Sequence, residues 1–242
     1  MRRLLWLGFS TALLALLLVG SFASGHLRFN YPDADLYPVR GVDVSHHQDR
    51  VDWTAVRSQG YSFAFIKATE GATHQDPLFV TNWSGAAAAG LARGAYHFFT
   101  FCTPAAQQAS NFIRVVAPGQ LMLPPVVDVE YKGNCTSPPT PAAIRSELVE
   151  FLRQLEAAYA LKPMIYVTTD SYREIVAGSF VDYPIWARDI FRKPRLPDGR
   201  SWAIWQYANR GSVSGVPSFI DFNVFNGSEA KWATCISRGI CQ

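Results

Sequence analysis

The chain has 242 residues, with 22 basic and 19 acidic side chains and a formal net charge of +3. This length suits one α/β-barrel domain, and a hydrophobic content of 49% is enough for a sizeable core. The small positive surplus, with no run of Lys or Arg in the body of the chain, argues against a nucleic-acid-binding protein.

The N-terminus has the pattern of a secretory signal. Arg2 and Arg3 precede an apolar stretch over residues 4–22, and a small-residue site follows that favours cleavage after Ala23. The apolar stretch is also almost long enough to span a bilayer, so an uncleaved membrane anchor is the alternative. In both cases the rest of the chain is expected to be secreted, periplasmic or otherwise extracytoplasmic.

Residues 24–38 have no clear hydrophobic period and are expected to be a linker. From residue 39 to residue 242 short apolar runs alternate with helix-like stretches, as in one domain. Strands are predicted at residues 41–44, 62–68, 93–99, 125–130, 163–168, 183–188, 202–207 and 219–223. Helices are predicted at residues 52–57, 77–90, 103–117 and 140–159 and after residue 171, the first four opening at Asp52, Asp76, Thr103 and Thr140.

Five strand–helix units followed by three strands with little helix indicate the fold class. Alternating strands and helices imply a parallel sheet, and eight strands in one domain imply closure into a TIM-like barrel. The functional site of such a barrel lies at the carboxyl ends of its strands.

Four cysteines fit an oxidising compartment and permit three pairings. The close spacing of Cys235 and Cys241 suggests one small C-terminal clip, which leaves Cys102 and Cys135 for a second disulfide. Zinc binding is the competing interpretation, but the chain has no C-x-x-C spacing.

Acidic residues gather at the predicted strand ends. Asp43 ends the first strand, Asp128 and Glu130 end the fourth, and Asp221 lies in the eighth. Residues two apart on a strand share a face, which places the Cα atoms of Asp128 and Glu130 about 7 Å apart. Two carboxylates this close resist joint ionisation, so one pKa rises and a proton is kept for general acid catalysis. The structural alternative is that such acids cap loops or pair with arginines.

Aromatic residues at the same strand ends suit sugar binding, because their rings pack against the C–H faces of sugars. Core packing is the alternative use of these rings, and it is expected for Phe63, Phe65 and Phe99. The residues expected to line the cleft are Tyr96, Tyr166, Trp205 and Trp186.

Histidines near Asp43 raise the alternative of a metal site. His46 and His47 are adjacent, so both could bind one ion only from a loop, with His97 as a third ligand. A metal-dependent deacetylase using Asp43, His46 and His97 is therefore a rival prediction, although no metal or other cofactor is expected.

Several segments together resemble glycoside hydrolase family 25, the Chalaropsis-type lysozymes, over about residues 39–226. The matching segments, in order, are RGVDVSHHQ (40–48), FIKATEG (65–71), GAYHFF (94–99), VVDVE (126–130), IYV (165–167), WQY (205–207) and IDFN (220–223). The resemblance implies a (β/α)5β3 barrel that cleaves the β-1,4 bond between N-acetylmuramic acid and N-acetylglucosamine. It further implies that Glu130 is the general acid, that Asp128 is its partner, that Asp43 and Asp221 are the other cleft acids, and that Tyr96 and Trp205 are cleft aromatics.

The expected partner is the glycan strand of peptidoglycan, and the expected state is a monomer that touches a membrane only through residues 4–22 if these are retained. We hypothesise that Asp128 orients the substrate acetamide, whose oxygen acts as nucleophile, while Glu130 serves as acid and then as base. This hypothesis requires retained anomeric configuration in the first product. The main rival is a barrel that binds cell-wall glycan without cleaving it.

Overall fold

Eight strands close into a barrel in the computed structural model, which describes residues 2–25, 27–28, 30–119, 123–239 and 241. The strands are β1 (Arg40–Val44), β2 (Tyr61–Glu70), β3 (His74–Gln75), β4 (Ala92–Phe98), β5 (Val126–Val129), β6 (Met164–Thr168), β7 (Ile185–Arg188), β8 (Ile204–Gly211) and β9 (Ile220–Phe225). Their hydrogen-bonded order is β1-β9-β8-β7-β6-β5-β4-β2, and the pairing of β1 with β2 closes the ring. The short β3 lies outside the ring, against β2.

The last strand of the barrel differs from the parallel sheet expected from the sequence. β9 runs antiparallel to both β8 and β1, whereas all other barrel neighbours are parallel. The reason is the short connection over residues 212–219, since a parallel strand needs a crossover of a dozen or more residues. Consequently β9 begins at the rim where the other strands end, and Asp221, its second residue, pairs with Asp43 of β1.

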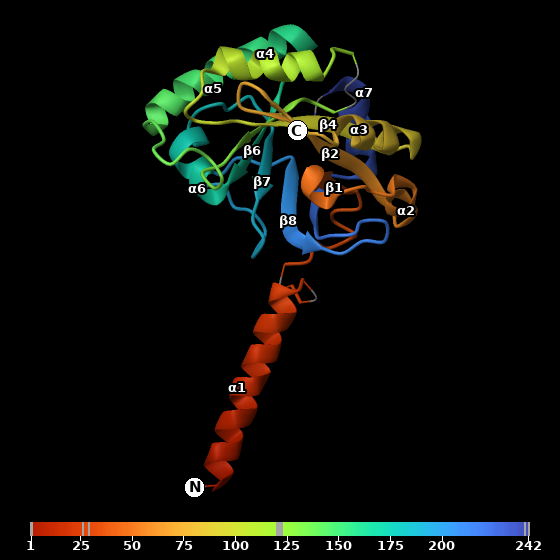
Figure 1. The fold of residues 1–242 in the computed structure, drawn as a ribbon, viewed down its shortest axis with the longest axis vertical. Coiled ribbons are helices and arrows are strands. Elements are labelled where there is room, and N and C mark those ends of the chain that lie inside the picture. The colour runs from red at the N-terminus through yellow and green to blue at the C-terminus, as the bar shows by residue number, and fades with distance from the viewer. Residues whose placement is uncertain (1, 26, 29, 120–122, 240, 242) are drawn as a thin grey trace.

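The five expected strand–helix units are present, and their helices surround the barrel (Figure 1). A C-terminal helix that the sequence analysis did not predict follows β9. The helical elements are α1 (Arg2–Ala23), the 3-10 turn η1 (His46–Gln48), α2 (Trp53–Ser58), α3 (Phe79–Ala88), α4 (Ala105–Val115), α5 (Pro141–Tyr159), α6 (Thr169–Ser171), the π-helical turn η2 (Tyr172–Val176) and α7 (Glu229–Arg238).

Two of the four predicted helix caps are confirmed. Asp52 caps α2 by accepting the backbone N–H of Ala55, and Thr140 caps α5. The predictions for Asp76 and Thr103 were wrong, because α3 begins only at residue 79 and α4 has no side-chain cap. The carboxylate of Asp76 instead accepts hydrogen bonds from His46 and from the backbone N–H of Leu78.

Aromatic rings fill the barrel interior beneath the rim. Phe65 packs against Phe63 and Trp186 at ring-centroid distances of 6.0 and 4.7 Å. A Cβ atom at Gly41 or Gly94 would lie within 2.3 Å of these phenyl rings, so glycine is required where the strands approach them. The N-terminal end of the barrel is closed by α7, whose Trp232 packs against Phe63 and Phe225.

The segment expected to be a linker contacts the barrel at two points. The Asn30 side chain donates a hydrogen bond to the Tyr207 carbonyl at 2.8 Å. Tyr37 is buried, with its ring 5.7 Å from that of Trp202 and 6.3 Å from that of Trp205. These contacts lead us to propose that the packed domain begins near residue 30 rather than at the expected boundary of residue 39; residues 26 and 29 lie outside the described part.

The predicted signal or anchor forms α1, which projects away from the barrel (Figure 1). Its large apolar side chains from Leu13 to Val19 are exposed, while the side chains of residues 1–11 lie outside the described part. Over the residues that are described, no helix combines the length and the hydropathy needed to cross a membrane.

Candidate active site

The carboxyl ends of the strands surround a cleft of about 320 Å³. A smaller cavity of about 90 Å³ adjoins it and reaches the aromatic floor at Tyr166 and Trp186. Both spaces are lined by the four acidic residues that the sequence analysis selected, namely Asp43, Asp128, Glu130 and Asp221. The fold therefore brings together acids that lie as far as 178 positions apart in the sequence, from residue 43 to residue 221.

Asp43 is held by two buried amides. Its Oδ2 accepts hydrogen bonds from Gln206 Nε2 at 2.9 Å and from Asn223 Nδ2 at 2.7 Å. Each amide is fixed in turn, because Tyr166 donates its hydroxyl to Gln206 Oε1 and Trp186 donates its indole N–H to Asn223 Oδ1. This network fixes the position of the Asp43 carboxyl group and leaves little freedom to rearrange.

Asp221 lies next to Asp43 and the two carboxyl groups interact directly. Burial raises the pKa of Asp43, although hydrogen bonds from Asn223, Gln206 and Asp221 oppose the rise. The pKa of Asp221 is raised well above its usual range, first by burial and then by the charge of Asp43. Of the two carboxyl groups, that of Asp221 is therefore the one that burial and the neighbouring charge favour in the protonated form.

Asp128 is the third residue of β5, two positions before Glu130, and lies in register with Phe98 and Tyr166 of the adjacent strands. It is 7% exposed, and its Oδ1 has no hydrogen-bond partner within the described chain. Burial, followed by the charge of Glu130, raises its pKa well above the ordinary value. A buried carboxyl oxygen without a partner is costly, so this atom is available to a ligand donor.

Glu130 follows the end of β5 and is more open to the cleft than Asp128. Burial raises its pKa, while the charges of Arg188 and Lys132 act in the opposite direction. The sequence predicted a raised pKa for one carboxyl group of the D-x-E pair. In the structure, burial raises the pKa of both Asp128 and Glu130.

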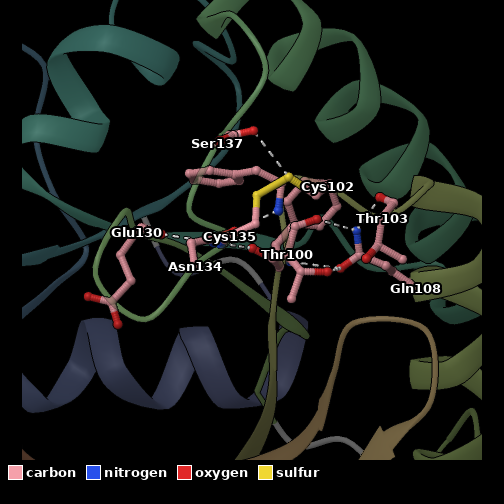
Figure 2. Close-up of a disulfide and its surroundings, with 10 residues drawn as sticks. Thr100, Cys102, Thr103, Gln108, Glu130, Asn134, Cys135 and Ser137 are labelled. Carbon is pink, nitrogen blue, oxygen red and sulfur yellow. Dashed lines mark hydrogen bonds between the residues drawn. A yellow bond between two sulfur atoms is a disulfide. The ribbon is translucent and has the colours of Figure 1, made fainter.

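The backbone around Glu130 is fixed by a clamp, which we define as Asn134 together with the Cys102–Cys135 disulfide (Figure 2). The Asn134 Nδ2 donates to the carbonyls of Glu130 at 3.0 Å and of Phe99 at 2.9 Å. Its Oδ1 accepts the N–H of Phe101 at 2.7 Å. The clamp therefore ties the loop that carries Glu130 to the loop after β4.

Both predicted disulfides are present. Cys102–Cys135 joins the loops after β4 and β5 beside the cleft. Cys235–Cys241 closes a short turn at the end of α7, at the opposite end of the barrel.

Three of the four predicted cleft aromatics line the cavities. Tyr96 borders both, and Tyr166 and Trp186 form the floor of the smaller one. The prediction for Trp205 was wrong. It is 2% exposed on the outer face of β8, packs against Tyr37, and donates its indole N–H to the Asp189 carbonyl at 2.8 Å.

The histidines do not support the deacetylase prediction. His97 is fully buried outside the barrel wall, between Thr69 Oγ1 and Gln108 Oε1, with its ring 4.9 Å from that of Phe151. Burial lowers its pKa to about 3. His46 pairs with Asp76 at 2.9 Å. The described residues contain no group of three His, Cys, Asp or Glu side chains placed to hold a metal ion.

Sequence reasoning missed four polar residues of the site, which are Gln206, Asn223, Lys67 and Arg188. Lys67 pairs with Glu70 at 2.7 Å, and its charge lowers the pKa of Asp128. The alternation of strand residues was the available signal for Gln206 and Asn223. Gln206 lies between Trp205 and Tyr207 and so faces the opposite side of β8, and Asn223 shares a face with Asp221.

A closed α/β barrel with carboxyl groups and aromatic rings at its carboxyl-terminal rim has the make-up of a carbohydrate-cleaving enzyme. Residues 42–216 match the family model for glycosyl hydrolases family 25. The chain belongs to this family and is a glycoside hydrolase, which confirms the family and barrel type expected from the motifs.

Individual relatives agree with this assignment. The YegX protein of Escherichia coli O157:H7 is 39% identical over 200 residues, or 81% of this chain and 72% of that protein. Lysozyme M1 of Streptomyces globisporus is 35% identical over 211 residues, or 82% of this chain and 71% of the lysozyme. The structure of a family 25 glycosyl hydrolase from Bacillus anthracis superimposes with a TM-score of 0.81 at 38% identity and covers 86% of this chain and 97% of its own.

Proposed function

We propose that the chain is a muramidase that cleaves the β-1,4 bond between N-acetylmuramic acid and N-acetylglucosamine in peptidoglycan. Family membership and the likeness to lysozyme M1 support the substrate class. The observation that carries the site assignment is the Asp128 Oδ1 atom, buried without a partner beside Glu130. This atom is suited to accept the N–H of a substrate acetamide.

In the proposed mechanism Glu130 donates its proton to the glycosidic oxygen as the bond to C1 breaks. The acetamide oxygen of the same sugar forms a bond to C1, and Asp128 Oδ1 accepts the acetamide N–H and so orients the acetamide toward C1. The Glu130 carboxylate then takes a proton from water, whose oxygen attacks C1 and releases the acetamide. Glu130 is thereby restored to its protonated form, and the configuration at C1 is retained.

Asp43 supports the protonated state of Glu130. Burial makes the largest contribution to its raised pKa, and the charge of Asp43 acts in the same direction. The amides of Gln206 and Asn223 keep that carboxylate in place. Asp43 and Asp221 are therefore proposed as electrostatic and substrate-positioning groups of the cleft.

The anomeric outcome tests this mechanism. Proton NMR of the reaction in its first minutes, before mutarotation, is expected to show the β-anomer as the first product from a soluble glycan. An α-anomer as the first product would rule out the acetamide route and require a water-attack mechanism with inversion.

A wall-binding barrel without hydrolytic activity is the rival function. A turbidity assay on purified cell walls separates the two, because a muramidase clears the suspension whereas a binding protein only sediments with it. The raised pKa of Glu130 favours the enzyme, since glycan binding alone needs no carboxyl group that retains a proton.

The two disulfides indicate an extracytoplasmic protein. We propose that it is secreted after cleavage at residue 23 or held at a membrane by residues 4–22. The domain is expected to act as a monomer on glycan strands.

A further inference from the structure

A second cavity of about 150 Å³ lies at the same rim, between the ends of β6 and β7 and the long β7–β8 loop. Val167, Tyr172, Pro194 and Leu196 contribute apolar walls. Arg188 and Arg195 line it as well, and we call it the basic pocket. The mechanism above leaves this cavity unused.

The loop that forms the outer wall is fixed by specific hydrogen bonds. Trp205 donates its indole N–H to the carbonyl of Asp189, where the loop begins, and Trp202 donates to the Pro194 carbonyl at 3.2 Å. The Tyr172 hydroxyl bonds the Asp198 carboxylate at 2.7 Å. The basic pocket is therefore a preformed feature rather than a gap under a loose loop.

The charge of the basic pocket is positive and partly uncompensated. Asp189 pairs with Arg192 at 3.5 Å and neutralises one arginine. Within the described residues, the side chains of Arg188 and Arg195 have no hydrogen bond or ion pair. Arg188 also faces the cleft, because it lies in register with Gln206 and lowers the pKa values of Glu130, Asp43 and Asp221.

We propose that the basic pocket binds the peptide that muramic acid carries through its lactyl group, an inference that rests on the proposed muramidase function. The apolar walls receive the lactyl and first side-chain methyl groups, and Arg188 with Arg195 binds a carboxylate of the next residue. Guanidinium groups suit this role because they present several donors to a carboxylate.

The reach of the substrate fits this arrangement. Neighbouring strands are about 4.8 Å apart, so the ends of β6 and β7 lie about 5–10 Å along the rim from Glu130 at the end of β5. An extended chain spans about 3.5 Å per residue, which places the lactyl group and first residue within about 7 Å of the sugar and the second residue near 10 Å.

The test compares two substrates, intact peptidoglycan and the same glycan chains after an amidase has removed the peptides. Arg195→Ala is expected to lower kcat/KM on intact peptidoglycan about fivefold, mainly through KM, as for a partly exposed ion pair. It should leave kcat/KM on peptide-free chains unchanged. Arg238→Ala is the control, since it removes the same charge from an exposed position on α7 at the far end of the barrel.

Equal loss on both substrates, or no loss on either, would overturn the proposal of a peptide site. Equal inhibition of cleavage of both substrates by inorganic phosphate would also overturn it, since the pocket would then be a general anion site. If the unmodified enzyme releases no muramic acid reducing ends from either substrate, the muramidase function itself fails, which is a distinct result.

Discussion

At the scale of single residues, the cleft concentrates carboxyl groups whose folded environment favours the protonated form. Asp221 is the clearest supporting case, because burial and the adjacent Asp43 both raise its pKa. A group whose pKa is raised on folding gives stability that is fully present below its unfolded pKa, about 4. That stability is lost as the pH rises through the folded pKa.

Asp221→Asn is therefore expected to stabilise the fold at about pH 7. At that pH the wild-type carboxyl group lowers the free energy of unfolding, because it must either be ionised while buried or take up a proton on folding. The amide is similar in shape and can still donate to Asp43 Oδ1 or Oδ2. We expect Tm to rise by roughly 3 °C at neutral pH, and the difference to vanish below about pH 4. A variant that is less stable than the wild type at neutral pH would contradict this assignment.

Arg188 is expected to set the alkaline limit of activity. The general acid must be protonated, so the rate falls as the pH rises through the pKa of Glu130. Burial raises that pKa and the charge of Arg188 opposes the rise. Arg188→Gln should consequently move the alkaline limb of the kcat/KM profile to higher pH. An unchanged limb, or a shift to lower pH, would show that Glu130 is not the group titrating there.

At the scale of elements, the sequence predicted all eight barrel strands and the four cleft acids. Strand periodicity and the rule that barrel sites lie at strand ends were sufficient for this. The prediction for Trp205 was wrong because the aromatic side chain, rather than that of its polar neighbour Gln206, was expected to point into the cleft. Alternation places only one of these two inside the barrel. Gln206 is the one that points inside, because its amide and that of Asn223 donate hydrogen bonds to the buried Asp43 carboxyl group.

The direction of β9 was not predicted, although the short connection before it was a signal in the sequence. Other features could not be foreseen because they depend on distant contacts. The predicted helix cap at Asp76 failed because Asp76 is engaged by His46, a residue 30 positions away. At the start of α4, near Thr103, the backbone N–H of Ala105 is instead bound by Glu147, 42 positions away. The clamp at Asn134 joins two loops, and no local pattern marks such a contact.

The clamp is expected to hold Glu130 in position for catalysis. Removing the disulfide as Cys102→Ala with Cys135→Ala frees the loop beside Glu130, and kcat is expected to fall about tenfold, or ~1.4 kcal/mol, with KM within twofold. The matched control is Cys235→Ala with Cys241→Ala, which should leave kcat unchanged because this disulfide lies at the far end of the barrel.

Both double variants lose stability, by roughly 4 and 2 kcal/mol for loops of 33 and 6 residues. Kinetics should therefore be measured well below both Tm values. If both variants lowered kcat equally, the loss would reflect general destabilisation, and the positioning role of the clamp would be contradicted.

At the scale of the whole molecule, the chain combines an apolar N-terminal helix with a barrel that begins near Asn30. The contacts of Asn30 and Tyr37 make residues 30–38 part of the barrel's outer layer rather than a free tether. A membrane-held form would then leave little free chain between the helix and the catalytic domain.

This domain boundary is testable with two shortened chains, one beginning at Asn30 and one at Val39. The second lacks the buried Tyr37 ring, which packs against Trp202 and Trp205, and is expected to lose ~3 kcal/mol of unfolding free energy. Thermal unfolding followed by circular dichroism measures the difference. Equal Tm values for the two chains would restore residues 30–38 to the role of a linker.

Glu130 is the residue proposed to drive cleavage at muramic acid in this barrel. Mass spectrometry of fragments released from purified peptidoglycan by the soluble domain, beside a Glu130→Gln variant of equal Tm, tests it most directly. We predict fragments with muramic acid at the reducing end from the wild type and none from the variant, which should still sediment with the walls. Fragments ending in N-acetylglucosamine, or equal release by both proteins, would contradict the account.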